Sequence, residues 1–157
     1  MPAKPMTAAL ILLALVGTIH AADKSPNQIL AGKPAATSGG SSRYYDGYGS
    51  FAGRASQNGT GTYLYDGHGA FAGRVDSSMG STRIYDGKGA FAGRTTTSGS
   101  TTSFYDAKGS FTGRSTTSGN STWFYDSKGA LSGRADASGG TTRYYDRQGR
   151  FVGRKGK

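Results

Sequence analysis

The twelve residues RYYDGYGSFAGR, from Arg43 to Arg54, return in closely similar form five more times at a constant interval of twenty residues. Each copy holds a Tyr-Asp pair, a glycine three residues after the Asp, an aromatic or aliphatic residue two positions later, and a closing Gly-Arg. Self-similarity at a fixed period is the signature of a repeat architecture. The Tyr column is Tyr45, Tyr65, Tyr85, Tyr105, Tyr125 and Tyr145, and an Asp follows each of them directly.

Each copy predicts a β-hairpin. In YDGYGSF, Asp46 opens a four-residue turn and Gly49 closes it, which suits a type I turn with a left-handed glycine at its exit. We therefore expect Tyr45 to face Phe51 across the two strands, and residue 43 to face Gly53. Dense Ser, Thr and Gly between the copies predict further turns.

The expected pairing gives both faces of each hairpin apolar residues. We assign the Tyr and Phe columns to the core, because a cross-strand aromatic pair contributes about 0.2–1 kcal/mol. The same register sets Trp123 opposite Gly133, whose missing side chain leaves room for the indole. The opposite face carries the residue before each Tyr, namely Tyr44, Leu64, Ile84, Phe104, Phe124 and Tyr144.

Six such hairpins must share a core, since one hairpin is not stable alone in water. They can stack into an open solenoid or close into a ring, and closure removes exposed strand edges. An open array normally ends in atypical capping repeats, whereas the first and last copies here are ordinary ones. We therefore predict an all-β fold in which six 20-residue β-hairpin repeats form a closed, shallow barrel with approximate six-fold symmetry. The alternative is an open hairpin solenoid.

The regions outside the repeats predict an exported protein. Residues 1–21 contain Lys4, the apolar run TAALILLALVG and a final small residue, Ala21, as a secretory signal peptide does. The run is shorter than the roughly 20 apolar residues of a spanning helix. We expect a flexible leader over 22–42, the repeat domain over 43–154 and a basic tail over 155–157. The mature protein would be periplasmic or secreted, without a membrane span, and without disulfides because it has no cysteine.

The block YYDxxGxFxGR resembles the repeats of the bacterial β-flower proteins, small exported chains in which Tyr-Asp-x-x-Gly hairpins radiate as petals around a shallow barrel. The resemblance covers residues 43–154. It implies an all-β architecture and an envelope or extracellular setting, but no functional residue. The block is more distantly similar to the Tyr-Asp repeats of RHS shells, in which Arg typically follows the Gly directly, as only Gly149-Arg150 does here.

Choline- and glucan-binding cell-wall repeats are also similar in length and carry paired aromatic residues. They end in Gly-Trp, however, whereas the copies here end in Gly-Arg and Trp123 is the single tryptophan. The aromatic walls that would hold choline by cation–π contact are therefore mostly missing.

The residue types between and within the copies argue against an enzyme, a metal site or a cofactor. His68 stands alone at a turn position, and no base accompanies the many Ser and Thr hydroxyls. Each Asp of the repeat is the expected partner of its own turn backbone. One carboxylate per twenty residues is also too sparse for a calcium-binding repeat.

The closing arginine of each copy is the candidate binding residue. The chain has 19 Lys and Arg against nine acidic residues, all Asp, and a formal charge of +10, which attracts anionic polymers. A ring of guanidiniums would present forked donors to phosphate, sulfate or carboxylate. The structural alternative is that these arginines bond loop carbonyls between hairpins. The six candidates are Arg54, Arg74, Arg94, Arg114, Arg134 and Arg154.

We therefore expect a non-catalytic envelope protein that binds an anionic polymer or partner through an Arg-rich rim. The expected partner is an anionic envelope polysaccharide or another envelope protein, and export argues against nucleic acid. Two alternatives stay open: a structural or assembly module without a small ligand, and a cell-wall glycan-binding repeat. An outer-membrane barrel fits less well, because the expected strands are shorter than the about 9–11 residues it needs.

Overall fold

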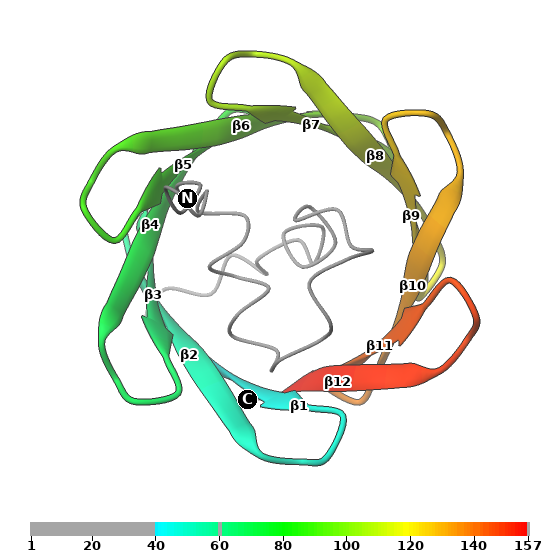
Figure 1. Cartoon of the computed structure of the whole chain (residues 1–157), viewed down its shortest axis with the longest axis horizontal. Helices are drawn as coiled ribbons and strands as arrows, with labels where there is room; N and C mark the ends of the chain where they lie inside the picture. Colours follow the sequence, from blue (N-terminus) through cyan, green and yellow to red (C-terminus); the bar gives the residue numbers. More distant parts are fainter. Residues whose placement is uncertain (1–39, 60, 157) are drawn as a thin grey trace, which may run out of the picture.

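The computed structural model describes residues 40–59 and 61–156. Within these ranges the chain forms twelve β-strands that close into a barrel, each strand pairing antiparallel with the strands before and after it (Figure 1). The predicted closed all-β barrel is confirmed, and the open solenoid is wrong. The strands are β1 (Ser41–Asp46), β2 (Phe51–Asn58), β3 (Gly61–Asp66), β4 (Phe71–Ser78), β5 (Ser81–Asp86), β6 (Phe91–Ser98), β7 (Thr101–Asp106), β8 (Phe111–Ser118), β9 (Ser121–Asp126), β10 (Leu131–Ser138), β11 (Thr141–Asp146) and β12 (Phe151–Gly156).

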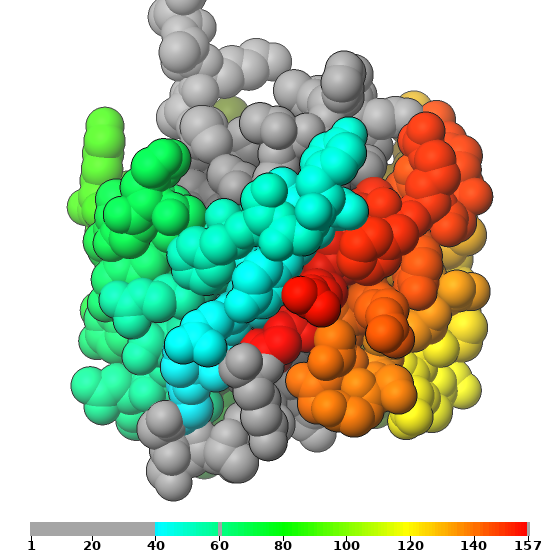
Figure 2. Space-filling model, turned by 90° about the horizontal axis from the view of Figure 1, so that it is seen from below, coloured from blue at the N-terminus to red at the C-terminus, as the bar shows by residue number. Residues whose placement is uncertain are grey.

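The barrel closes where its first and last strands meet. β1 and β12 lie side by side on the wall (cyan and red in Figure 2) and pair from Arg43↔Gly156 to Asp46↔Gly153. We call this junction the seam. The strands extend two residues beyond each end of the range 43–154, so Lys155 is part of the wall and pairs with Tyr44. The predicted signal peptide and most of the predicted leader lie outside the described residues.

The turns between Tyr-Asp and Phe form as the sequence predicts. In the turn after β7, Asp106 accepts a hydrogen bond on its backbone oxygen from the Gly109 amide at 3.1 Å. Its Oδ1 accepts two more, from the amides of Lys108 and Ser110, both at 2.9 Å. Gly109 has φ +82°, the left-handed conformation that favours glycine. This arrangement recurs in all six turns.

A β-bulge corrects the predicted register beyond the turn. Tyr45 faces Phe51 as predicted, but Tyr44 then faces Gly53, which leaves Ala52 as the extra residue. Residue 43 therefore faces Arg54 and not Gly53. The same shift moves the tryptophan pairing, so that Trp123 faces Arg134 and Phe124 faces Gly133. A bulge adds one residue to one strand, and alternation counted straight through it gives the wrong partner.

The core is a ring of inward-facing side chains, one from each strand. The residues before Tyr are buried on the odd strands, and each pairs with a smaller residue on a neighbouring even strand, as Leu64 does with Ala55. Large and small residues alternate in this way in the interiors of small barrels. The ring is Tyr44, Ala55, Leu64, Val75, Ile84, Thr95, Phe104, Ser115, Phe124, Ala135, Tyr144 and Lys155. All but Lys155 are at most 7% exposed.

The Tyr and Phe columns lie on the outer wall, so their assignment to the core is wrong. Tyr85 and Phe91 make the predicted edge-to-face pair, with ring centroids 6.0 Å apart, but Phe91 is 41% exposed. Four other copies have the same pair at 6.0–6.1 Å. Because side chains alternate between faces along a strand, the burial of residue 84 forces Tyr85 outward.

Candidate functional site

The six candidate arginines lie on the outer wall, one on each even-numbered strand. Each follows a buried glycine and precedes a ring residue, as Arg94 stands between Gly93 and Thr95. Five of the six are exposed, and Arg74 is partly buried. The candidates therefore encircle the barrel, and we call them the arginine belt.

Every arginine of the belt covers the Tyr ring of the following hairpin. Arg54 lies 4.1 Å from the centroid of Tyr65, and the next four copies repeat the contact at 4.7–5.3 Å. Across the seam, Arg154 covers Tyr45 at 4.9 Å. A guanidinium over an aromatic face is attracted by the ring quadrupole. Each closing arginine therefore links one hairpin to the next by covering a tyrosine side chain. The sequence alone did not predict this partner.

Three further arginines double the charge at three of the six hairpins, two of which meet at the seam. Their strand partners are arginines of the belt: Arg43 faces Arg54, Arg83 faces Arg94, and Arg143 faces Arg154. Arg43, Arg83 and Arg143 are exposed, and none of the cation–π contacts found in the described ranges involves them. Like charges directly opposite each other on a sheet are destabilising. These three arginines were missed because only the bulge brings position 43 opposite position 54.

Two arginines of the belt are neutralised by neighbours on their own strands. Arg74 pairs with Asp76 at 2.9 Å and Arg134 pairs with Asp136 at 3.1 Å. Both Asp residues belong to the segments between copies and not to the Tyr-Asp column. The other four even-numbered strands contain no acidic residue, so their belt arginines are not neutralised within their own strand.

The positive charge is densest at the seam. Arg143 of β11 faces Arg154 of β12 on one side of the seam, Arg43 of β1 faces Arg54 of β2 on the other, and we call these four the seam patch. Across the seam itself Arg154 faces Tyr45 and Arg43 faces Gly156, so the two pairs are offset by two residues. The other outward strand residues of these four strands are Thr, Ser, Tyr, Phe, Gly and Asn. Asp136, which faces Arg143 from β10, is already paired with Arg134.

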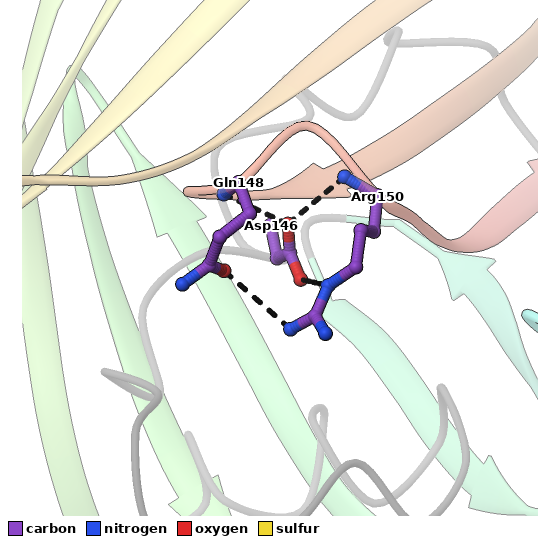
Figure 3. A network of polar contacts seen from close by, with 3 residues as sticks. All are labelled: Asp146, Gln148 and Arg150. Atoms are coloured by element: carbon purple, nitrogen blue, oxygen red, sulfur yellow. Dashed lines mark hydrogen bonds and ion pairs between the residues drawn. The ribbon is translucent and has the colours of Figure 1, made fainter.

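The Asp side chains of the repeat accept hydrogen bonds from the backbone of their own turns. In the last turn, Asp146 also forms an ion pair. Asp146 accepts from the amides of Gln148 and Arg150 at 2.9 Å each, and its Oδ2 accepts from the Arg150 side chain at 2.7 Å (Figure 3). Burial of this carboxyl acts to raise its pKa. The hydrogen bonds and the positive charge from Arg150, with the Gln148 amide, outweigh burial and hold the pKa of Asp146 below its usual value. Within the described ranges, no three His, Cys or acidic residues gather as metal ligands would.

No family model matches this chain, and the search of curated proteins found no match either. The described part of the chain holds no helix that is long and apolar enough to cross a membrane. The fold defines the chain as a closed, twelve-stranded antiparallel β-barrel with an arginine belt.

Proposed function

We propose that this chain is an exported, non-catalytic protein of the bacterial envelope that binds an anionic polymer through the outer arginines, with the seam patch as the strongest point of attachment. The observation that carries the proposal is the facing of arginine by arginine at three places on the wall. A bound sulfate, phosphate or carboxylate between two guanidiniums would replace repulsion by charge-assisted hydrogen bonds.

The stacking of the belt on tyrosine supports the same proposal. A guanidinium held over a ring keeps its N–H edges free in the plane, and less of its side-chain freedom remains to be lost on binding. The approximate six-fold repetition of the belt would let one polymer engage several arginines in turn, which raises avidity without new contacts. The net charge of +10 favours the encounter.

The test is binding to heparin, as a representative sulfated polymer, over a series of salt concentrations. The variant Arg43→Gln/Arg83→Gln/Arg143→Gln removes the doubled charges and leaves all six arginine–tyrosine contacts in place. We expect at least a tenfold loss of affinity at low salt, and a shallower dependence on salt because fewer counterions are released. Lipopolysaccharide and peptidoglycan, tested alongside, distinguish the source of the anionic groups.

The matched control is Lys88→Gln/Lys108→Gln/Lys128→Gln, which removes the same charge from three exposed turns. This control should keep most of the affinity. Equal losses in the two triple variants would show a response to net charge alone, and absence of heparin binding in the parent protein would also overturn the proposal.

A second candidate function is assembly, and the half-exposed apolar residues next to the turns favour it. Phe51, Phe71, Phe91, Phe111, Leu131 and Phe151 are 41–44% exposed around the same end of the barrel. Contiguous exposed apolar patches mark sites of protein contact, and a partner that spans several hairpins would cover these residues together. Sedimentation of the parent protein and of a Phe91→Ser/Phe111→Ser variant tests this: an assembly module should form a complex that the variant loses.

A further inference from the structure

A cavity of about 840 Å³ occupies the interior of the barrel at the end opposite to the Tyr-Asp turns. Its lining runs from β4 round to β12 and includes the turns between copies. Thr95, Ala135 and Lys155 of the core ring belong to the lining, so the cavity reaches inward as far as this ring. The volume lies in the range of small-molecule sites, about 300–1,000 Å³.

The walls of this cavity present hydroxyl groups in cross-strand couples. Thr97 and Thr102 lie with their hydroxyl oxygens 3.0 Å apart, and Thr117 and Thr122 repeat the arrangement at 3.0 Å. A hydroxyl donates one hydrogen bond and accepts two. Each couple uses one donor and one acceptor internally, so one donor and three acceptor positions remain for a molecule in the cavity.

Lys155 is the one charged residue among the lining residues of the described chain. At the equivalent ring positions the other copies carry Ala55, Val75, Thr95, Ser115 and Ala135. Lys155 faces Tyr44 on one side and Thr142 on the other, and burial lowers the pKa of its amine. No carboxylate of the described residues lines the cavity, so a negatively charged ligand would meet attraction without repulsion.

We propose that this cavity binds an acidic sugar, with its carboxylate on the Lys155 amine and its hydroxyls on the threonine couples. An ammonium attracts a carboxylate more strongly where water is partly excluded. Hydroxyl couples with spare donors and acceptors match the mixed donor and acceptor character of a sugar ring. The site is separate from the arginine belt, because the ring residues face inward and the belt faces outward.

The experiment is calorimetric titration of the parent protein with galacturonate, and with galactose as the neutral comparison. We expect galacturonate to bind and galactose to bind at least tenfold more weakly. Lys155→Ser, which places the residue of position 115 at this point of the ring, should weaken galacturonate binding at least tenfold. Lys128→Ser removes the same charge from an exposed turn and should leave it unchanged.

A second variant tests the location without touching the charge. Ala137 lines the cavity and is exposed at its mouth, so Ala137→Trp fills space there and should abolish binding while the thermal unfolding midpoint stays near that of the parent. Amide shifts on galacturonate addition should include Thr97, Thr117 and Thr142. Binding that survives both variants, or absence of galacturonate binding in the parent, would overturn the proposal. Heparin binding should be unaffected by either variant, which separates this site from the belt.

Discussion

Gly73 shows how closely neighbouring hairpins approach each other. Its φ is +155°, and a Cβ atom built on it would lie 2.5 Å from the carbonyl oxygen of Tyr85 on the next hairpin. Gly93 and Gly113 have the same conformation and meet Tyr105 and Tyr125 in the same way. In these three copies the glycine before the closing arginine therefore makes room for a neighbour, as the sequence suggests, but the neighbour is backbone.

The change Gly73→Ala should be strongly destabilising. A backbone oxygen cannot move aside as the end of a flexible side chain can, so we expect a loss of about 3 kcal/mol in the free energy of unfolding, in the range of severe single substitutions. Gly99 is the matched control: it has φ +56°, and a Cβ atom added there would have nothing within 4 Å. Gly99→Ala should cost about 1 kcal/mol, for left-handed strain alone. Urea unfolding measures both, and equal losses would contradict the role given to Tyr85.

The strand register of each hairpin is set by its own turn and then shifted by one residue at its bulge. The Asp side chain and the left-handed glycine fix the Tyr–Phe pair, and the extra residue at position 52 of each copy shifts the partner of every residue beyond it. The shift places the core-ring residue of the first strand, such as Tyr44, opposite Gly53. It also places the belt arginine, such as Arg54, opposite position 43. The outer charge pattern is therefore a consequence of one inserted residue per hairpin.

The last hairpin should respond to acid through Asp146. Its pKa in the folded protein is lowered, so the ionised carboxyl stabilises the fold above the usual aspartate range, and this contribution is lost as pH falls through the lowered pKa. In Arg150→Gln the ion pair of Figure 3 is absent, and the pKa of Asp146 should rise. Carboxyl carbon shifts in an NMR titration measure it directly. The turn at Asp126, which has Ala130 at the matching position, is the internal control; an unchanged Asp146 midpoint would contradict the assignment.

At the scale of the whole molecule, closure depends on the pairing of two strands that no turn connects. The seam holds four residue pairs, whereas the junction of β2 with β3 holds six. Arg154 over Tyr45 adds a side-chain contact there. Because Arg43 faces Gly156, the two ends of the described barrel lie beside each other.

A circular permutant should therefore fold. We would join Gly156 to Ser41 through a four-residue linker with the sequence of Thr97–Ser100, and open the chain between Gly99 and Ser100. The linker replaces an unconnected seam by a turn like those of the other junctions, so the thermal unfolding midpoint should equal or exceed that of a linear 41–156 chain. Circular dichroism and sedimentation check the fold and the size. A permutant that aggregates while the linear chain folds would contradict the equivalence of the junctions.

Much of the local structure could be predicted because it depends on residues close together in the sequence. The turn at Asp106 needs only its own side chain, two nearby amides and Gly109. The closed barrel could be inferred from the sameness of the copies, since no copy is built as an end. The arginine belt could be identified as a column of residues, but its partners could not, because Arg54 and Tyr65 meet only through the register between hairpins.

By itself, the sequence determined the repeat, the turns, the Tyr–Phe pairs and the all-β class, since each follows from local backbone preference or from strict periodicity. Only the tertiary structure decided which face is the core, because both faces of each hairpin carry apolar residues and closure of the barrel turns the residues before Tyr inward. It also decided that Arg43 stands beside Arg54, and that Lys155, the one lysine of the core ring, lines the interior cavity. These are contacts between strands, and they exist only once the register around the whole ring is set.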